Sequence, residues 1–191
     1  MLSLSRGKES ENYEEGLKIR KVEVTEYNNQ WPSMFKEEAN VIHKIFGPEI
    51  IEIYHIGSTS VYGLKAKPVI DIMPVVSKVH LIDEFNKNML GIGYESKGEN
   101  GLSGRRFFQK GGDNRTHHVH IYQLGNPGIE RHLAFRNYLR ENPSAAEKYG
   151  DLKEELSYIF PYDMDSYIKG KEKVLLEIER KALSWYRSSR G

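Results

Sequence analysis

The sequence predicts an α+β fold, in which a mixed β-sheet flanked by helices is followed by a helical C-terminal region. Three observations lead to this prediction. Short β-branched and apolar runs typical of strands lie between residues 50 and 123. After Asn126 the apolar residues recur at helical spacing almost to the C-terminus. The 191 residues, 38% hydrophobic and 29% charged, have an ordinary globular composition that one hydrophobic core can serve.

The composition changes once, close to the N-terminus. Residues 1–16 are polar and rich in Glu and Ser, without clear periodicity, so we expect a flexible N-terminal arm. Residues 17–191 are then expected to form a single domain, whose helical C-terminal part begins at about residue 129.

The first part of this domain is expected to contain a short strand followed by an amphipathic helix. Lys18–Thr25 alternates imperfectly and predicts a short edge strand. Pro32–Phe46 carries apolar residues three and four positions apart, with Gly47 and Pro48 directly after it, so it predicts a helix that ends there.

The middle of the chain supplies the sheet. Ile50–Ile56 is short and β-branched, and Pro68–Val76 is a nearly continuous apolar run, so both are expected to be strands of a buried sheet. Val79–Met89 has helical spacing. Three further strands separated by glycine-rich turns are predicted at Gly93–Ser96, Arg105–Lys110 and His117–Gln123.

The last part of the chain is expected to contain three helices, and the middle one carries a start signal. Ser144 and Glu147 have the spacing of a capping box, which predicts that Ser144 caps that helix. The helices are predicted at Ile129–Arg140, Ser144–Ser157 and Asp165–Trp185. Lys169–Lys173 in the last helix is expected to be solvated surface.

Charge and composition exclude several classes of protein. With 28 Lys and Arg against 27 Asp and Glu, the net charge of +1 provides no general attraction to polyanions, so nucleic acid is not an expected partner. Without cysteine, any metal must be held by His and carboxylates. No apolar run approaches the roughly 18 residues of a spanning helix, so a cytoplasmic protein without a membrane partner is expected. The oligomeric state is not predictable from these features.

The loop between the two buried strands has the residues of a phosphate site. Gly57, Ser58, Thr59 and Ser60 follow the first strand, and Lys67 precedes the second. Small residues let the backbone approach an anion, hydroxyl and N–H groups donate to it, and lysine adds charge. The alternative is an ordinary turn, since glycine and serine are common turn residues.

Asp71 interrupts the apolar run of the second strand. A buried carboxylate is costly without a cation or a metal, so Asp71 is a candidate catalytic and metal-binding residue. A structural salt bridge to Lys67 or Arg105 is the alternative.

Around these residues the sequence resembles the GrpB family of the polymerase-β-like nucleotidyltransferase superfamily. The segment HIGSTSVYGLKAKPVIDI at residues 55–72 carries the resemblance. Residues 117–122 (HHVHIY) and 131–140 (RHLAFRNYLR) resemble the family's later motifs in the expected order, so the likeness extends from about Val24 to Leu156. It implies a nucleotidyltransferase-like fold that binds a nucleotide or a phosphorylated small molecule, with a divalent metal cation as cofactor.

The sequence departs from the superfamily's pattern at Met73. Two carboxylates one residue apart hold the divalent cations in the superfamily, and Asp71 occupies the first of these positions. Met73 occupies the second, on the same face of the strand, and its thioether does not ligate a hard cation. This argues against a standard two-metal mechanism.

His118 and His120 offer a different set of ligands. One residue separates them in a predicted strand, so their side chains share a face and can converge with Asp71 as a two-histidine, one-carboxylate metal site. Such a site favours a softer metal than magnesium. The alternatives are ordinary polar residues on an open strand face, or hydrogen-bond partners of Asp71.

Two arginines are the remaining candidates for phosphate binding. Arg105 lies on a strand near the expected site and Arg131 on a later helix, and the planar guanidinium group donates two hydrogen bonds to one phosphate. A solvated helix face is the alternative for the helical arginines.

The residues leave two kinds of function open. One is a metal-dependent enzyme that transfers or hydrolyses a nucleotidyl or phosphoryl group. The other is a module that binds a nucleotide or a coenzyme A precursor without catalysis, which Met73 accommodates. The link to coenzyme A rests on the resemblance, because similar domains occur fused to dephospho-coenzyme A kinase.

Overall fold

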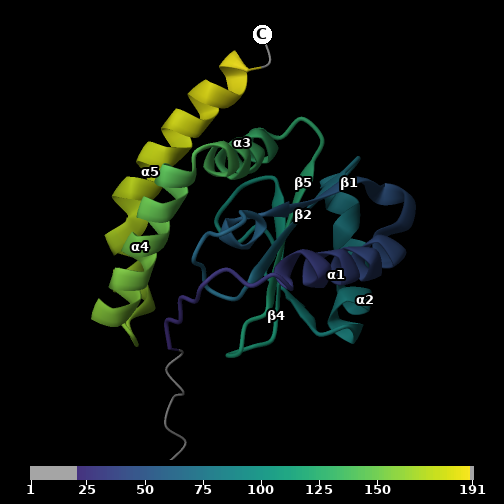
Figure 1. The fold of residues 1–191 in the computed structure, drawn as a ribbon. Coiled ribbons are helices and arrows are strands. Elements are labelled where there is room, and N and C mark those ends of the chain that lie inside the picture. Colours follow the sequence, from purple (N-terminus) through teal and green to yellow (C-terminus); the bar gives the residue numbers. More distant parts are fainter. Residues whose placement is uncertain (1–20, 190–191) are drawn as a thin grey trace, which may run out of the picture.

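The computed structural model describes residues 21–189. A five-stranded sheet has helices on both faces, and the two longest helices form a separate layer at one side (Figure 1). The strands are β1 (Ile50–Ile56), β2 (Ile70–Val76), β3 (Tyr94–Ser96), β4 (Arg105–Lys110) and β5 (His117–Gln123). The α-helices are α1 (Trp31–Phe46), α2 (Asn86–Gly91), α3 (Pro127–Glu141), α4 (Pro143–Ile159) and α5 (Met164–Ser188).

The sheet is mixed, with the strand order β1-β2-β5-β4-β3. β1 pairs with β2 and β4 with β5 in antiparallel orientation, whereas β2 and β5 are parallel. In the parallel pair, Asp71 is in register with His118. This pairing places the candidate residues side by side at the centre of the sheet.

One face of the sheet packs against α1 and α2. Ile72 of β2 and Val119 of β5 are completely buried there against Ile42 and Phe46 of α1 and Met89 of α2. Alternate strand residues point to this face, because successive side chains of a strand leave on opposite sides. The largest buried cluster therefore lies on the side of the sheet opposite Asp71.

The other face carries α3. Met73 and Tyr122 pack with Leu133 of α3, while α5 packs across α3 through Ala134 and Ala182. The loop between β1 and β2 joins this helical layer, because its apolar residues are buried against α3, α4 and α5. Asp71 lies on this face, next to the helical layer.

The structure confirms the α+β prediction, with local differences. The segment predicted as one helix at Val79–Met89 is a 3-10 helix over Val79–Phe85 that continues as α2. The predicted edge strand at Lys18–Thr25 is wrong over the described residues: Thr25 forms only an isolated bridge with Ala66. The proposed arm at residues 1–16 lies outside the described part of the chain.

The first residues of helices α3 and α4 also differ from those predicted. The capping box was wrong, because α4 begins one residue earlier at Pro143 and no side chain caps it. Proline favours the first helical position, since its φ is already helical and it has no N–H to satisfy. α3 begins at Pro127 for the same reason, with the Asn126 side chain accepting a hydrogen bond of 2.8 Å from Gly128 N.

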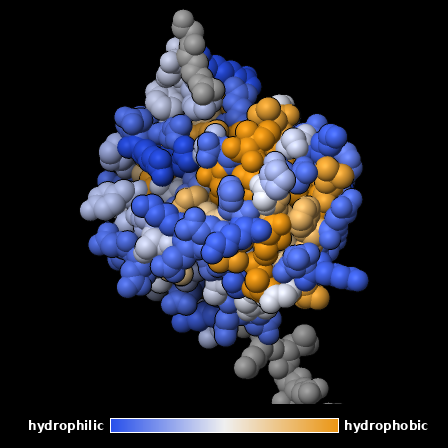
Figure 2. Space-filling view, turned by 90° about the vertical axis from the view of Figure 1, so that its right-hand side faces the viewer, coloured by the Kyte–Doolittle hydropathy of each residue, from blue (hydrophilic) through white to orange (hydrophobic). Residues whose placement is uncertain are grey.

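Apolar side chains also gather on the surface at the α1–β1 side of the molecule, which Figure 2 shows. A groove of about 420 Å³ runs there between α1 and the edge strand β1, and Phe35, Ile51 and Ile53 contribute to its lining. None of the helices within residues 21–189 has an apolar stretch able to cross a lipid bilayer.

Candidate functional site

The turn after β1 has a backbone conformation that requires glycine. Gly57 has φ 71° and ψ −173°, a region that is essentially closed to other residues. A Cβ atom there would lie 2.5 Å from Oδ2 of Asp71. The 3-10 turn Ser58–Ser60 follows, closed by the Ser60 hydroxyl, which donates a 2.6 Å hydrogen bond to Gly57 O. The absence of a side chain at Gly57 therefore lets the turn and the carboxylate come together.

Asp71 and the two histidines meet across the parallel strands. Oδ1 of Asp71 lies 3.1 Å from Nδ1 of His118 and 3.2 Å from Nε2 of His120. These three ligand atoms lie within 4.8 Å of one another, a separation at which a single metal ion can bind all three. The structure thus brings together the predicted set of two histidines and one carboxylate.

The same contacts determine the charge of Asp71. Burial raises the pKa of its carboxyl, but the hydrogen bonds and charges of His118 and His120 outweigh burial and hold that pKa well below its usual range. Burial lowers the pKa of His120, so its imidazole is mostly neutral near pH 7. An ionised carboxylate and neutral imidazoles are the forms that ligate metals.

Aromatic and basic groups surround the histidines. The Phe107 ring lies 5.3 Å from the ring of His118 and 5.0 Å from that of His120. Arg105 stacks on Phe107, with its guanidinium carbon 4.9 Å from the ring centre, and its Nη1 is 3.5 Å from Nδ1 of His120. His132 of α3 lies 5.4 Å from the His120 ring, and burial lowers its pKa to about 3. Arg105 thus lies beside the cluster, and His132 is a neighbour that the sequence analysis missed.

A group of lysines approaches the turn from the helical layer. Nζ of Lys153 on α4 donates a 2.8 Å hydrogen bond to the Ser58 hydroxyl, and Lys153 is only 3% exposed. Burial lowers the pKa of Lys153 well below its usual value, and the charges of Lys171 and Lys67 lower it further. Asp71 acts in the opposite direction on the pKa of both Lys153 and Lys171. Three lysines therefore lie within electrostatic range of one another beside a single carboxylate.

Sequence reasoning missed Lys153 and Lys171. Lys171 is half-buried, so the prediction that Lys169–Lys173 is all solvated surface was wrong at that position. A lysine on a helix has no sequence signal that separates a buried from a solvated side chain. Lys67, which was predicted, places Nζ 5.4 Å from the centre of the Tyr167 ring.

Other predicted residues have partners inside the protein. The Thr59 hydroxyl is buried and donates to Val69 O at 3.3 Å, and it lies 3.0 Å from Nε2 of His55. Ser60 O accepts two hydrogen bonds from Arg140. Arg131 forms an ion pair of 2.8 Å with Glu179 on α5. These contacts hold the turn and the helices in place around the site.

The mixed sheet and its neighbours define a protein of the nucleotidyltransferase-like fold. A structure of the Cid1 poly(U) polymerase with bound Mg 3'-dATP matches with a TM-score of 0.52 over 77% of this chain and 49% of that chain. Its sequence identity is 13%, so this match shows the fold alone.

The chain belongs to the GrpB family, whose model, described as GrpB protein, matches residues 21–181. The crystal structure of the conserved protein GrpB from Enterococcus faecalis is similar, with a TM-score of 0.83 and 48% identity over 85% of this chain and 98% of that chain. The UPF0157 protein YqkA of Bacillus subtilis (strain 168) is 48% identical over 87% of this chain, which spans only 48% of the length of YqkA. A dephospho-CoA kinase of Mycobacterium leprae (strain TN) is 28% identical over 73% of this chain and 41% of that protein.

Proposed function

We propose that this protein binds a nucleotide or a phosphorylated small molecule beside a single divalent transition metal, and that it transfers or hydrolyses a nucleotidyl or phosphoryl group. One observation carries the proposal. A metal-ligating set of Asp71, His118 and His120 lies next to a glycine-serine turn whose Ser58 hydroxyl is bonded to a buried lysine.

The donor set decides which metal chemistry fits. The fold family implies two hard cations between paired carboxylates, but Met73 takes the second carboxylate position and is completely buried, against Ile56 and Tyr122. A magnesium pair does not fit these residues. One transition metal does fit, because two imidazole nitrogens and one carboxylate oxygen are its usual ligands.

The lysines supply the complementary charge for a phosphate group. Lys153 is buried with two more lysines nearby, and the electrostatic cost of that arrangement depresses its pKa. A phosphate beside Ser58 would offset this cost, because an anion favours the charged form of all three lysines. Ser58 already accepts a hydrogen bond from Lys153, so its hydroxyl proton remains available to a phosphate oxygen.

The chain's own residues then have distinct parts in the reaction. When bound, the metal would act as a Lewis acid on a phosphoryl oxygen and increase the acidity of an attacking hydroxyl or water. Asp71, His118 and His120 would hold it. Lys153, Lys171 and Ser58 would hold the phosphate group that leaves when the phosphorus–oxygen bond breaks, and stabilise the negative charge that develops there.

A non-catalytic binding module is the second candidate, and the burial of Met73 favours it. Binding requires the turn and the lysines, whereas in-line transfer is usually assisted by more than one carboxylate. The similarity to a dephospho-CoA kinase over part of that protein makes a coenzyme A precursor a reasonable ligand for such a module.

One set of measurements distinguishes the enzyme from the non-catalytic binding module. Manganese, cobalt, zinc and magnesium are titrated calorimetrically, followed by ATP and dephospho-coenzyme A with each metal that binds, and products are separated by chromatography. We expect manganese, cobalt or zinc to bind more tightly than magnesium, and Asp71→Asn to weaken that binding at least tenfold. Asp83→Asn is the matched control, because Asp83 is paired with Arg106 and takes no part in the cluster.

The outcomes have clear meanings. Turnover that Asp71→Asn abolishes supports the enzyme, and tight binding without products supports the module. If Asp71→Asn leaves the affinity for both metal and nucleotide at the wild-type value, the site is refuted.

A further inference from the structure

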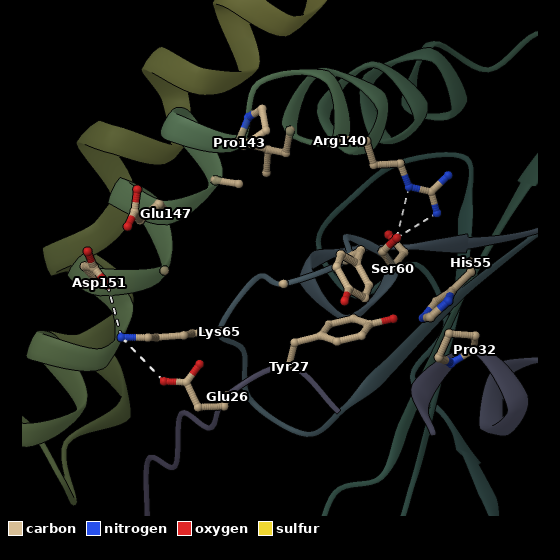
Figure 3. Close-up of a pocket in the computed structure, with 15 residues that line it drawn as sticks. Glu26, Tyr27, Pro32, His55, Ser60, Lys65, Arg140, Pro143, Glu147 and Asp151 are labelled. Carbon is tan, nitrogen blue, oxygen red and sulfur yellow. Dashed lines mark hydrogen bonds and ion pairs between the residues drawn. The ribbon is translucent and has the colours of Figure 1, made fainter. Parts of the chain in front are cut away.

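A cavity lies beside the β1–β2 loop, and it is separate from Asp71, His118 and His120. It has a volume of about 730 Å³, within the range that holds a drug-sized ligand. Asp71, His118, His120 and Lys153 are not among its lining residues. Figure 3 shows its walls: Tyr27, Ser60 and Arg140 on one side, and Glu147 and Asp151 of α4 on the other.

Two tyrosines give the cavity an aromatic surface. The rings of Tyr27 and Tyr62 are 5.1 Å apart, and Tyr27 in turn packs edge-on against the buried Trp31 at 5.2 Å. Tyr62 is 81% exposed although it lines the cavity. A ring that is fixed on one side and open on the other is suited to stack on a planar ligand.

The cavity also holds polar groups with unused hydrogen-bonding capacity. Arg140 donates through Nε and Nη2 to Ser60 O, at 3.0 and 2.6 Å, and forms no ion pair with any residue in the range 21–189. Glu147 forms neither a hydrogen bond nor an ion pair with the described residues. Nη1 of Arg140 is thus a donor and the Glu147 carboxylate an acceptor, on opposite walls.

The charge of the lining distinguishes this cavity from the lysine group. Three carboxylates line it, those of Glu26, Glu147 and Asp151, against the two cations of Lys65 and Arg140. Lys65 is already bonded to Asp151 at 3.1 Å and to Glu154 at 2.6 Å. The excess of negative charge disfavours a polyphosphate and favours a neutral ligand with amine donors.

We propose that this cavity is a second binding site, which takes the base of an unphosphorylated nucleoside. The flat base stacks on Tyr62, its amine groups donate to Glu147, and its carbonyl or ring-nitrogen acceptors meet Arg140. A nucleobase has an aromatic face with donors and acceptors along its edge, which matches this arrangement of groups.

The site is connected to the Asp71 site through one short turn. Arg140 holds the carbonyl of Ser60, and two residues earlier Ser58 is bonded to Lys153. A ligand that binds Arg140 would change the hydrogen bonds between Arg140 and Ser60 O. Occupancy of the cavity is therefore expected to alter the affinity for phosphate at Ser58. This coupling rests on the proposed function, whereas binding in the cavity does not.

The test uses the full chain, without added metal. Adenosine, guanosine, cytidine and uridine are titrated while saturation-transfer NMR detects contact with the base protons. We expect at least one nucleoside to bind with a dissociation constant below about 1 mM, and Tyr62→Ala to weaken that binding at least tenfold. Tyr158→Ala is the matched control, because Tyr158 is 78% exposed and does not line the cavity. Both tyrosines are exposed, so neither change is expected to prevent folding.

Specific results overturn the inference. It fails if no nucleoside binds, if Tyr158→Ala weakens binding as much as Tyr62→Ala, or if tryptophan binds in place of the nucleosides. It also fails if Asp71→Asn abolishes nucleoside binding, since the nucleoside would then occupy the Asp71 site and not the cavity. A failure of ATP binding alone refutes the proposed function and leaves the nucleoside site intact.

Discussion

Replacing Gly57 with alanine tests whether the close approach of the turn to Asp71 holds the site together. The new Cβ would lie 2.5 Å from Oδ2 of Asp71, closer than real Cβ contacts come. The backbone at φ 71° and ψ −173° costs roughly 1–3 kcal/mol for a residue other than glycine. Displacing the carboxylate from His118 and His120 costs about another 1.5–3 kcal/mol, because these hydrogen bonds involve a charged group.

Gly63→Ala separates these two costs. Gly63 also has a positive φ, of 76°, but an added Cβ there meets nothing within 4 Å. We expect Gly63→Ala to lower the free energy of unfolding by roughly 1–2 kcal/mol through the backbone alone. Gly57→Ala should lower it by roughly 2.5–6 kcal/mol, the sum of the backbone and carboxylate costs.

Urea denaturation measures both changes, and calorimetry of manganese or zinc binding gives the second readout. We expect metal affinity to fall at least tenfold in Gly57→Ala and to stay at the wild-type value in Gly63→Ala. The reasoning would be refuted if the two variants were equally stable and bound metal equally well. That result would mean that Asp71 keeps its position without the space that Gly57 leaves.

Three further predictions follow from buried groups. Lys153→Met should leave the free energy of unfolding at pH 7 unchanged or raise it by about 1 kcal/mol, because it removes a buried cation. Its affinity for ATP, measured by calorimetry, should fall at least tenfold. A large loss of stability would contradict this prediction. Burial lowers the pKa of His55 to about 4. As the pH falls, the His55 side chain of the unfolded chain therefore binds a proton before that of the folded protein does. The free energy of unfolding should fall by roughly 3 kcal/mol between pH 6.5 and pH 4. Urea denaturation of His55→Asn should lack that part of the pH dependence. Met73→Asp should destabilise the fold by about 3 kcal/mol or more rather than create a second magnesium site, because Met73 is completely buried; tight magnesium binding by a stable variant would count against the assignment.

Much of the sheet was predictable because its signals are local. The apolar run at Ile50–Ile56 is strand β1, the run at Pro68–Val76 contains strand β2 (Ile70–Val76), and α1 follows its three-and-four spacing. The convergence of Asp71 with His118 and His120 was predictable as well, since residues two apart on a strand share a face. The resemblance supplied the order of the motifs, which made it reasonable to place these strands together.

The remaining features depend on tertiary packing. The burial of Lys153 and the position of His132 arise where α3 and α4 pack against the sheet and the β1–β2 loop, and no spacing within either helix indicates which residue faces inward. The cavity beside Tyr62 is formed by segments from four parts of the chain. The start of α4 at Pro143 shows a different cause, because two competing local signals were present and the proline prevailed over the serine.

The parallel register of β2 and β5 has a consequence for folding. Asp71 and His118 are 47 residues apart in sequence. A slip of one position would replace His118 and His120 by Val119 together with either His117 or Ile121. A metal held by all three ligands would therefore cross-link two distant segments only when they are correctly paired. At 100 times its dissociation constant, such a metal would add about 2.7 kcal/mol to the folded state. Metal affinity would then be a direct readout of correct strand pairing, independent of whether any reaction takes place.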